Sequence, residues 1–475
     1  MLNHIDDIMD ATNLCHISIG LDDFDALKYG CTTHLATYIL NELRKKLNSN
    51  IALLDYPNLV RLNPSIPWKT RGNGAIALRM GVSCSYASDL QELLQVIEEL
   101  AERYINVFLN EFNIKLPDFE PGLVIAPHPL PEDFTWLYEY ALTDIVILDQ
   151  DLISKLIKKG FVFSQKYRKR GIVGALAAIM WSCRARDYTF ELLTYRSKRM
   201  YGKSRCIDEE SVKVFDNLTK GESFNNYDYN EGRTLIIPHG ADPILYGVRG
   251  EKPEVVKKAL SIIKVCEPLV GWTVFRTNQA TDDHAVYRAI EELRPYRTCR
   301  TRGFVASKPV IIKGGSVVIK IFDATGEIYL AFFKPSKLVN VASALEIGDY
   351  IEVQGQVKMW SNKQIIHVEK VIILRASNVY KCKSLRCPIC GNRMEKKGVG
   401  KGYKCEKCNT VILNPELACV KLFRNVTHKL FLPPPHSQKH LLKPIDRYGK
   451  EKNIYNCKLL PIDAATRILE PLEFL

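Results

Sequence analysis

Three carboxylates lie close together near the start of the chain: Asp22, Asp23 and Asp25. They follow residues 16–21, in which apolar residues alternate with smaller or more polar ones, as on a strand with one buried face. Hard Mg²⁺ prefers carboxylate oxygens as ligands, so this group could hold a magnesium ion. An acidic loop that only contacts solvent is the alternative that the spacing leaves open.

A turn and the expected start of a helix come directly after the carboxylates. Gly30 allows a flexible turn, and Thr32 or Thr33 can cap a helix whose apolar residues recur every four positions over residues 35–47. The free backbone N–H groups at a helix start favour phosphate. Carboxylates beside such a helix start indicate a site for a magnesium-bound nucleotide.

A second set of polar residues lies in a loop rich in proline and glycine. Residues 63–74 contain two prolines and two glycines, which excludes regular secondary structure there. Trp68 offers an aromatic face, and Lys69 and Arg71 offer two cations that could clamp phosphates or a flipped base. The same residues also fit a structural role, with Trp68 in a core and Lys69 in solvent.

Four cysteines near the end of the chain have the spacing of metal ligands. Cys387 and Cys390 form one Cys-x-x-Cys pair, Cys405 and Cys408 form another, and 14 residues separate the two pairs. Four thiolates at this spacing can close a tetrahedral Zn²⁺ site, as in zinc ribbons, and leave no open coordination position. We therefore expect a structural zinc ion that stabilises a small basic module.

Two further polar clusters adjoin expected strands in the middle of the chain. The ends of strands are where binding sites are often built, but loop acids without a partner are also commonly solvated, so both interpretations remain open. The clusters are Asp242 with Glu251, and Asn278 and Gln279 with Asp282 and Asp283.

The net charge of +13 is distributed unevenly along the chain. Residues 381–475 carry 19 Lys and Arg against 8 Asp and Glu, whereas residues 81–151 carry 2 against 14. The positive end indicates a polyanionic partner such as nucleic acid. The negative part fits either a solvated helical face or an attraction for a cationic substrate.

The elements expected around these residues change character along the chain. Strands and amphipathic helices over the first 150 residues or so indicate an α/β domain. From about residue 154, two helices over several strands fit a ferredoxin-like α+β sandwich. From about residue 300, short β segments with a hairpin turn at 323–326 and a short helix at 336–345 resemble an OB-fold barrel.

Aromatic residues of the expected barrel allow two interpretations. OB-folds are common platforms for single-stranded nucleic acid, on which aromatic rings stack with bases. The same rings can instead fill the interior of the barrel, which we expect for most of them. The residues concerned are Phe322, Tyr329, Phe332 and Phe333.

Length and composition set the remaining limits. A chain of 475 residues with 46% apolar residues can hold several domains with cores of their own. The nearest approach to a membrane span, residues 171–181, falls short of the ~20 apolar residues needed. The N-terminus lacks the charged and then apolar order of a signal peptide. Fourteen cysteines, mostly single, indicate a reducing interior in which thiols stay free or bind metal, so we expect a cytoplasmic protein.

Several longer motifs follow one another in a fixed order. They are Gly20-Leu-Asp22-Asp23-Phe-Asp25, Gly30-Cys-Thr-Thr33, Asn63-Pro-Ser-Ile-Pro-Trp-Lys69-Thr-Arg71-Gly-Asn-Gly74, Arg170-Gly-Ile-Val-Gly-Ala-Leu-Ala-Ala, His239-Gly-Ala-Asp242-Pro and Phe275-Arg-Thr-Asn278-Gln279. With the OB-like region and the four cysteines, they make residues 14–410 similar to the archaeal tRNA-isoleucine 2-agmatinylcytidine synthetase (TiaS) family. Phe24 departs from the family pattern Asp-Asp-Thr-Asp, which has a small hydroxyl residue there.

The resemblance implies a multidomain α/β and α+β architecture. The expected parts are a kinase-like ATP-dependent domain at 1–153, a ferredoxin-like domain at 154–295, an OB-fold at 296–379, a zinc ribbon at 380–415 and a basic extension at 416–475. The extension matches the family poorly, and we expect part of it to be mobile until RNA is bound.

The resemblance also implies an activity. The family consists of ATP-dependent ligases that phosphorylate the 2-oxo group of the wobble cytidine in the CAU-anticodon isoleucine tRNA and replace it with agmatine, which allows AUA decoding. ATP, Mg²⁺ and a structural Zn²⁺ are the expected cofactors. The tRNA and agmatine are the expected partners, and neither a membrane nor a protein partner is implied.

Residue roles carry over from the family by position. Its phosphoryl-transfer acids correspond to Asp22, Asp23 and Asp25, and its phospho-accepting threonine corresponds to Thr32. Elementary chemistry agrees, because an amide-like oxygen is a poor leaving group until it is phosphorylated, and cations would neutralise the developing charge. The expected ATP-binding residues are Asp22, Asp23, Asp25, Gly30, Thr32, Thr33, Lys69 and Arg71.

Agmatine carries a guanidinium group, which carboxylates bind through two parallel hydrogen bonds. The two polar clusters in the middle of the chain are therefore the candidate agmatine ligands, and the base that deprotonates the amine is not identified. The candidates are Asp242, Glu251, Asn278, Gln279, Asp282 and Asp283.

A non-catalytic OB-fold and zinc-ribbon protein that only binds nucleic acid is the alternative. It would explain the basic half of the chain but leaves the three acids and the proline- and glycine-rich loop without a role. A conventional P-loop enzyme is disfavoured because no Gly-x-x-x-x-Gly-Lys-Ser/Thr motif occurs.

Overall fold

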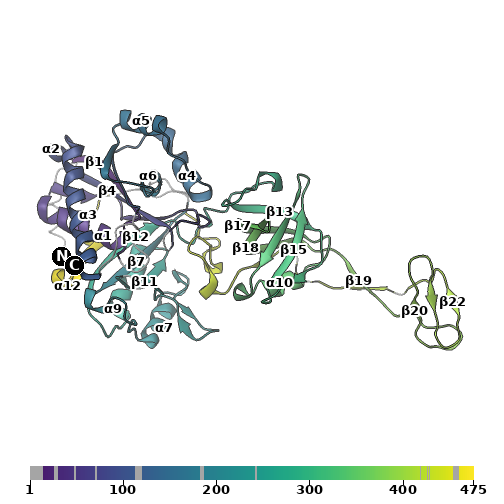
Figure 1. Ribbon diagram of the computed structural model, residues 1–475. Helices are drawn as coiled ribbons and strands as arrows, with labels where there is room; N and C mark the ends of the chain where they lie inside the picture. The colour runs from purple at the N-terminus through teal and green to yellow at the C-terminus, as the bar shows by residue number, and fades with distance from the viewer. Residues whose placement is uncertain are drawn as a thin grey trace.

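A computed structural model shows three parts in succession: a large N-terminal body, a β-barrel, and a small cysteine-rich module at the end of a two-stranded arm (Figure 1). The residues that the structure describes are 14–25, 30–47, 50–69, 72–112, 120–181, 187–240, 243–417, 419–424, 426, 428–452 and 459–475.

One mixed sheet runs through the whole N-terminal body, in the order β6-β5-β1-β4-β3-β12-β7-β11-β8. The strand β2 (Ile51–Leu53) pairs with β4 at its side, and β25 (Thr466–Ile468) pairs with β12. The main strands are β1 (Leu14–Asp22), β3 (Asn58–Arg61), β4 (Gly74–Ser83), β5 (Gly122–Pro127), β6 (Val162–Arg168), β7 (Thr189–Arg196), β8 (Ser223–Phe224), β11 (Ile244–Gly250) and β12 (Leu269–Thr277).

Helices cover both faces of the N-terminal half of this sheet, because its strands alternate between two cores. Ile17, Ile19 and Leu21 of β1 face a core that they share with α1 and α3. Val124 and Ala126 of β5 face a second core beneath α4, α5 and α6. These helices are α1 (Thr32–Leu47), α3 (Leu90–Phe112), α4 (Trp136–Thr143), α5 (Gln150–Lys158) and α6 (Ile172–Met180), and α2 (Cys84–Ala87) follows β4.

The second half of the sheet has its own helices on one side. They pack over β7, β11 and β12 around a core that includes Phe215, Val256 and Val274. A short β9–β10 ribbon (Tyr227–Asp228 and Arg233–Thr234) adjoins it. The helices are α7 (Glu209–Leu218), α8 (Pro253–Lys257) and α9 (Ala259–Ile262).

The expected boundary between the first two domains falls inside α5. The strand β6 and the helix α6, which follow that boundary, pack onto the N-terminal strands β5 and β1. The two halves meet where β12 runs parallel to β3, with Arg276 opposite Asn58 and Thr277 opposite Leu59. One continuous sheet therefore joins the regions in which the sequence suggested two separate units.

The barrel has the strand pattern of an OB-fold, as the sequence indicated. Its hairpin, short helix and two long strands agree with the expected segments, and β17 and β18 pair along most of their length. Phe332 is fully buried inside, whereas Phe322 is 44% and Phe333 39% exposed. The elements are β13 (Thr298–Val305), β14 (Val310–Ile311), β15 (Val317–Phe322), β16 (Glu327–Phe332), α10 (Val339–Ser343), β17 (Tyr350–Trp360) and β18 (Lys363–Arg375).

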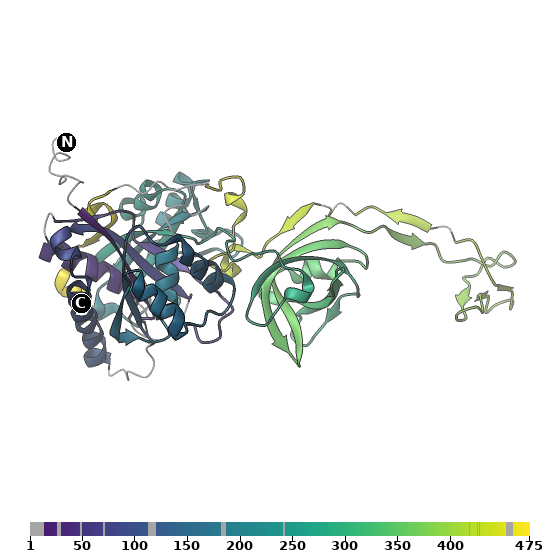
Figure 2. The same cartoon turned by 90° about the horizontal axis from the view of Figure 1, so that it is seen from above.

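The cysteine-rich module lies far from the body. An antiparallel arm of β19 (Val379–Cys382) and β23 (Cys419–Leu422) leads to it from the barrel (Figures 1 and 2). The module itself is a small sheet of β20 (Glu395–Lys396), β21 (Tyr403–Lys404) and β22 (Val411–Ile412).

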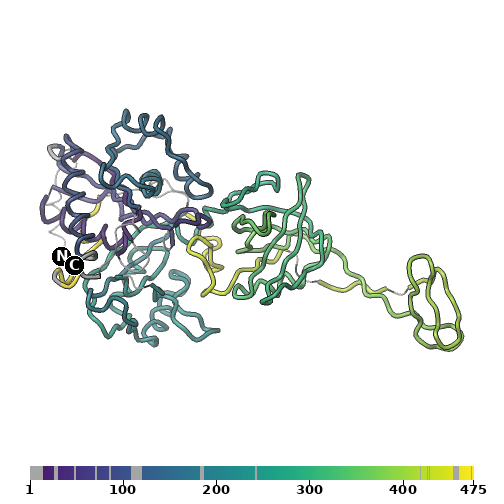
Figure 3. Tube along the Cα trace, viewed as in Figure 1, coloured from purple at the N-terminus to yellow at the C-terminus, as the bar shows by residue number. Residues whose placement is uncertain are grey.

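The C-terminal extension returns from the module to the barrel and the body, as the yellow end of the trace in Figure 3 shows. Its strand β24 (Lys429–Phe431) pairs with β18 of the barrel, and β25 adds to the sheet of the body. The helices α11 (Ile462–Ala465) and α12 (Pro471–Phe474) complete the chain. Parts of residues 428–452 and 459–475 thus pack against the barrel and the N-terminal body.

Disulfide bonds correct the expectation that the thiols stay free or bind metal. Strand pairing brings their partners together from positions 37 to 69 residues apart, so that spacing along the chain gave no signal. The cysteine count therefore does not indicate a reducing compartment. The bonds are Cys15–Cys84, Cys206–Cys266 and Cys382–Cys419.

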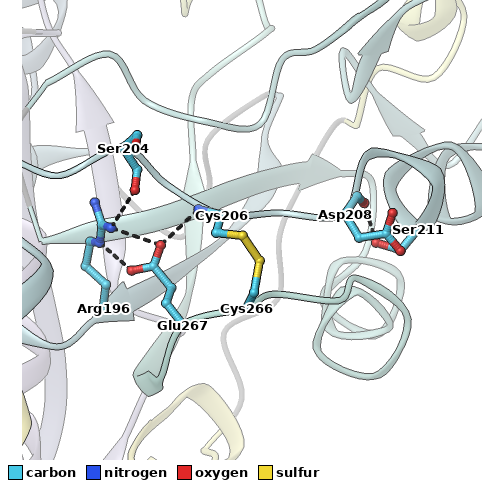
Figure 4. The surroundings of a disulfide bond; sticks show 7 residues. All are labelled: Arg196, Ser204, Cys206, Asp208, Ser211, Cys266 and Glu267. Carbon is cyan, nitrogen blue, oxygen red and sulfur yellow. Dashed lines mark hydrogen bonds and ion pairs between the residues drawn. A yellow bond between two sulfur atoms is a disulfide. The ribbon is translucent and has the colours of Figure 1, made fainter.

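The Cys206–Cys266 bond adjoins a buried ion pair (Figure 4). Nε and Nη2 of Arg196 lie 2.7 and 2.9 Å from the two carboxylate oxygens of Glu267, and both side chains are buried. Oε1 of Glu267 also accepts a hydrogen bond of 3.1 Å from the backbone N–H of Cys206. The disulfide thus attaches the segment around Cys266 and Glu267 to the loop at Cys206, and the ion pair attaches it to the end of β7.

Within the described parts of the chain, no helix is both long enough and apolar enough to cross a membrane.

Candidate active site

The three aspartates lie on a tight turn at the end of β1, a central strand of the sheet. Asp23 adopts a left-handed backbone conformation with φ of +58°, and Gly30 before α1 has φ of +72°. The hydroxyl of Thr32, the first residue of α1, donates to Oδ1 of Asp25 at 3.3 Å and accepts from the backbone N–H of Phe24 at 3.2 Å. The helix start is thereby attached to the acidic turn, as the sequence predicted.

Glycines let the helix α6 approach the first aspartate closely. A methyl group on Gly174 would overlap Oδ2 of Asp22, and one on Gly171 would lie 2.9 Å from the backbone oxygen of Asp22. Only a residue without Cβ fits at Gly174 with Asp22 in this place. This explains the two glycines of the Arg170-Gly-Ile-Val-Gly segment.

Asp22 is placed where its charge requires a compensating cation. Burial raises the pKa of Asp22 well above its usual value, and the neighbouring carboxylates of Asp23 and Asp25 raise it further. Clustered carboxylates at such a site favour the binding of a cation, which relieves their mutual repulsion. The donor set, with oxygen ligands alone, fits a hard divalent ion.

Phe24 occupies the position at which this chain departs from the family pattern. Its side chain is fully buried and meets the ring of Tyr167 edge-on, with 5.3 Å between the ring centroids. The side chain packs in the core that lies under α1 and α3. Phe24 thus anchors the acidic turn in the core, while Asp23 and Asp25 on either side remain in the turn.

A first cavity of about 860 Å³ lies on one side of the acidic turn. Its polar lining includes Asp22, Asp23, the N-terminus of α6 and the cations Lys69 and Arg170. Its apolar lining comes mainly from residues 145–148 and Ile153. A cavity of this size with both charged and apolar lining suits a ligand that combines phosphates with a flat ring.

A second cavity of about 540 Å³ lies on the other side of the turn. Asp25, Thr32 and Thr33 form part of its wall, and Asn73 lines both cavities. The remaining wall comes from residues 233–240, from β3, β7 and β11, and from the C-terminal extension. It includes Arg61, Glu191, His239, Arg249, His436 and His440. The acidic turn therefore separates two cavities of different chemistry.

The proline- and glycine-rich loop forms part of the first cavity. Trp68 does not fill a core: it is 46% exposed, and the guanidinium of Arg170 lies 5.8 Å from its ring centroid. Surrounding protein lowers the pKa of Lys69, and the cations Lys439 and Arg61 lower it further. Arg71 lies outside the described residues.

Three of the predicted agmatine ligands have other partners in the interior. Glu251 is bound by Arg447 at 2.6 Å and by Lys452 at 2.7 Å. Asp282 forms an ion pair with Lys370 of the barrel. Asp283 accepts a hydrogen bond of 2.9 Å from the hydroxyl of Tyr138, and burial raises the pKa of Asp283 to about 6.

The two amides among the predicted agmatine ligands lie directly behind the second cavity. Oδ1 of Asn278 accepts from the backbone N–H of Arg61 at 2.7 Å, and its Nδ2 donates to the backbone oxygen of Arg61 at 2.9 Å. Gln279 contacts Glu191 and His440, which both line that cavity.

None of the five described agmatine candidates lines either of the two cavities, and Asp242 lies outside the described residues. Their contact with agmatine stays a prediction. Asn278 instead holds the backbone of Arg61, and Gln279 holds the side chains of Glu191 and His440, all in the wall of the second cavity.

Sequence reasoning missed three residues of the second cavity: Arg61, Glu191 and His440. Glu191 is a carboxylate within β7, a strand whose residues are all buried, and an acid in so apolar a run was the one signal available. It lies 3.8 Å from Nε of Arg249. His440 gave no signal, because it belongs to an extension without clear periodicity.

The four cysteines of the distal module come together as predicted. Their sulfur atoms all lie within 4.8 Å of one another. The pairs Cys387–Cys408 and Cys390–Cys405 have Sγ–Sγ distances of 3.4 Å. Four converging thiols of this kind fit a tetrahedral structural metal site, closed to substrate.

Four family models match consecutive parts of the chain. The TiaS TCKD domain matches residues 18–164, the TiaS FLD domain residues 169–284, an OB-fold nucleic acid binding domain residues 300–374, and the TiaS C-terminal zinc ribbon domain residues 386–425.

Individual relatives match over almost their whole length. An isoleucine-tRNA 2-agmatinylcytidine synthetase, TiaS from Ignisphaera aggregans, is 50% identical over 96% of this chain and 99% of its own. The crystal structure of a complex of TiaS with isoleucine tRNA and ATP matches with a TM-score of 0.75 and 32% identity, over 91% of this chain and 97% of the other. A complex of TiaS with isoleucine tRNA, AMPCPP and agmatine matches with a TM-score of 0.73 and 30% identity, over 93% of this chain and all of the other. The acidic turn, the barrel and the four-cysteine module thus occur in a chain that belongs to the TiaS family.

Proposed function

We propose that the protein uses ATP to replace the 2-oxo group of the wobble cytidine of CAU-anticodon isoleucine tRNA with agmatine. The observation that carries this proposal is the acidic turn between two cavities, one suited to a nucleotide and the other to an acceptor. Relatives named as 2-agmatinylcytidine synthetases of isoleucine tRNA support the same reaction.

We place ATP in the first cavity. The phosphates would lie against Lys69, Arg170 and the N-terminus of α6, and the adenine against the apolar lining around residues 145–148. Arg71, which follows Lys69 closely in sequence, would add a second cation from the same loop. The relative crystallised with isoleucine tRNA and ATP supports the nucleotide assignment.

Asp22, Asp23 and Asp25 would hold Mg²⁺ through their carboxylate oxygens. When bound there, the ion would supply positive charge that offsets the negative charge developing during phosphoryl transfer. The clustering of the three acids and the burial of Asp22 support this role, because a bound cation would offset their mutual repulsion. Gly30 lies just before α1, and Thr33 is the second residue of that helix.

Thr32 is the proposed phospho-accepting threonine. Its hydroxyl contacts Asp25, which could orient the oxygen towards a phosphate. Thr33, also buried and in the wall of the second cavity, is the natural comparison. Tandem mass spectrometry of the peptide after incubation with ATP would identify the phosphorylated residue. Phosphate found on Thr33 and absent from Thr32 would contradict the assignment.

The second cavity would receive the cytosine and agmatine. Asn73 lines both cavities, and Asp25 of the acidic turn lines the second one. An acceptor bound in the second cavity would therefore lie close to the ATP phosphates. Phosphorylation of the cytosine oxygen makes it a leaving group that an amine can displace. The relative crystallised with isoleucine tRNA, AMPCPP and agmatine supports the presence of both small molecules in one enzyme.

The remaining modules would hold the tRNA. The barrel offers Phe322 and Phe333 on its surface, and aromatic rings of this kind stack with unpaired bases. A structural zinc ion on Cys387, Cys390, Cys405 and Cys408 would keep the distal module folded, where its lysines and arginines can contact phosphates.

Replacing Asp22 with Asn tests the proposal. The variant removes one carboxylate charge without changing size, so agmatine incorporation into the tRNA should be abolished while the tRNA affinity stays nearly unchanged. Mass spectrometry of the CAU-anticodon isoleucine tRNA, after incubation with ATP and agmatine, measures the product. Asp151→Asn, at an exposed aspartate on α5, is the matched control.

The non-catalytic alternative makes the opposite prediction for the wild-type protein. A protein that only binds nucleic acid consumes no ATP when tRNA is added, whereas the proposed enzyme does. Loss of tRNA binding by Asp22→Asn with normal turnover would also contradict the assignment of the acidic turn.

A further inference from the structure

Two histidines of the C-terminal extension line the second cavity: His436 and His440. Under the proposed function, an amine must lose a proton before its nitrogen can attack the cytosine ring, and the acids of the turn are occupied with the cation. The cavity therefore needs a proton acceptor that is neutral before the reaction, and a histidine is the side chain best suited to that role.

Hydrogen bonds determine which nitrogen of His440 carries the hydrogen. Nε2 of Gln279 donates to the carboxylate of Glu191, and a carboxylate can only accept, so the orientation of the Gln279 amide is settled. Its oxygen therefore faces Nδ1 of His440 at 2.9 Å. Because an amide oxygen also only accepts, Nδ1 carries the hydrogen and Nε2 keeps a lone pair.

The Nε2 atom of His440 lies beside Gly72, which has no side chain of its own. A methyl group on Gly72 would lie 3.0 Å from Nε2 of His440 and 2.6 Å from Nη1 of Arg61. Gly72, Arg61 and His440 all belong to the wall of the second cavity. The lone pair is thus next to a cation and to the space in which an acceptor would bind.

The charges that face His440 keep its ring neutral. The guanidinium of Arg61 holds the pKa of His440 well below its usual value, and the cations Arg249 and Lys69 act in the same direction. The nearby negative charge, Glu191, is separated from the ring by the amide of Gln279. The other two histidines that line the cavity differ. A carboxylate oxygen of Asp228 lies 2.7 Å from Nδ1 of His436, and no described residue forms a hydrogen bond with the ring of His239.

We propose that Nε2 of His440 accepts the proton of the attacking agmatine amine; this assignment rests on the proposed function. The ammonium group gives one proton to Nε2, and the freed lone pair forms the bond to C2 of the cytosine. The C2–O bond breaks, and the phosphate leaves with its electron pair and with the second proton of the nitrogen. One hydrogen remains on the new C–N linkage, and His440 returns its proton to water.

His440→Asn tests this assignment, because the Asn amide can still donate to Gln279 but has no counterpart of Nε2. The full-length protein is assayed with ATP, the CAU-anticodon isoleucine tRNA and agmatine. Agmatine incorporation should fall by about 10²–10⁴-fold in kcat, with a small change in the KM for agmatine. Consumption of ATP that depends on tRNA should persist. His428→Asn, at an exposed histidine outside the lining of both cavities, is the control.

A nucleophile that needs no deprotonation separates a base from a merely structural residue. An aminooxy analogue of agmatine has a terminal amine that is already neutral at the pH of the assay. The kcat for incorporation of this analogue should fall less than about tenfold in His440→Asn, whereas the kcat for agmatine falls by about 10²–10⁴-fold. Equal losses for both nucleophiles would overturn the proposal, as would normal agmatine incorporation by the variant.

A second variant, Gly72→Ala, keeps the imidazole and adds one methyl group beside Nε2 of His440. It tests the same assignment if His440→Asn misfolds. It should also lower agmatine incorporation more than ATP consumption. Gln279→Leu, which releases Nδ1, should lower kcat with little change in KM. Failure of the wild-type protein to incorporate agmatine at all would instead contradict the proposed function, and so the two failures are distinguishable.

Discussion

Single residues decide how closely the elements of the active site approach one another. Gly174 allows α6 to touch Asp22, Thr32 ties the helix α1 to Asp25, and Phe24 supports the turn from the core. The sequence indicated the acids and the threonine through their type and spacing. It gave no indication that a glycine far along the chain faces the first aspartate, because that contact depends on the packing of α6 on β1.

Gly174→Ala should therefore impair catalysis while preserving the fold. The added methyl group would overlap Oδ2 of Asp22, so the carboxylate must move away from its position. A displacement of this kind can cost about 10²-fold in kcat. Steady-state kinetics of agmatine incorporation measures the loss, and circular dichroism checks the fold. Gly326→Ala, in the hairpin of the barrel, is a control with room for the methyl group. Unchanged turnover by Gly174→Ala would contradict the predicted role of Asp22.

His34 makes the stability of α1 depend on pH. Burial lowers the pKa of His34 to about 3, from a value near 6.5 in an unfolded chain. Because the unfolded state binds the proton more readily, the folded state loses stability as the pH falls from about 6.5 towards 3. Over that window one such group contributes about 1.4 kcal/mol per pH unit.

Urea unfolding of the N-terminal body at several pH values tests this prediction. His34→Phe keeps a ring against Phe474, with which His34 stacks at 4.0 Å between ring centroids, but removes the titration. Between pH 6.5 and 3, the free energy of unfolding should change with pH less steeply in the variant, by about 1.4 kcal/mol per pH unit. Parallel slopes for the two proteins would refute the assignment to His34.

Elements that are distant in sequence are joined by more than strand pairing. The segment that leads into α7 and the segment that leads into β12 are connected by the Cys206–Cys266 disulfide and by the hydrogen bond from the backbone N–H of Cys206 to Glu267. Glu267 also forms a buried ion pair with Arg196 at the end of β7 (Figure 4). Periodicity could not indicate the covalent link, since the two cysteines lie 60 residues apart in loops.

Replacing both Cys206 and Cys266 with Ser should destabilise this half of the body. Closing a loop of 60 residues removes chain entropy from the unfolded state worth up to about 4 kcal/mol. Denaturant unfolding under oxidising conditions measures the difference in the free energy of unfolding. Under a strong reductant the wild type should unfold as the double variant does. Equal stability of the two proteins without reductant would show that the bond does not form.

At the scale of the whole molecule, polar contacts connect the body with the barrel. His284 of the body lies 3.2 Å from Glu369 of the barrel, and Lys439 of the extension lies 2.7 Å from the same carboxylate. Asp282 and Lys370 form an ion pair across the same junction. The extension thus contributes both to this junction and to the second cavity, whereas the distal module connects to the barrel through its arm (Figures 1 and 3).

Cys405→Ser should consequently affect one module and leave the others intact. Three thiolates hold zinc more weakly than four, and the small core of the module depends on its metal site. We expect loss of zinc and weaker tRNA binding, without a change in the unfolding of the N-terminal body. Metal analysis and a binding titration measure the two effects. Lys407→Ser, in the same knuckle, should retain the metal. Full zinc content in Cys405→Ser would refute the four-thiolate site.

The sequence by itself determined the features that depend on local spacing. The acidic turn before a helix, the alternating strands of the barrel and the two Cys-x-x-Cys pairs are patterns within short segments, and such patterns follow directly from the geometry of strands, turns and metal ligands. For the same reason the family could be identified from its motifs.

Only the tertiary structure decided which distant residues share a cavity. Glu191 and His440 line the second cavity, and Gln279 contacts both of them from behind it. The contacting pairs are 88 and 161 residues apart in sequence, and no local pattern relates them. The disulfides, the sheet shared by two expected domains and the return of the C-terminal extension have the same origin. Long-range packing selects these contacts from many that the sequence permits, because their free energy depends on burial and charge in the assembled fold rather than on neighbouring residues.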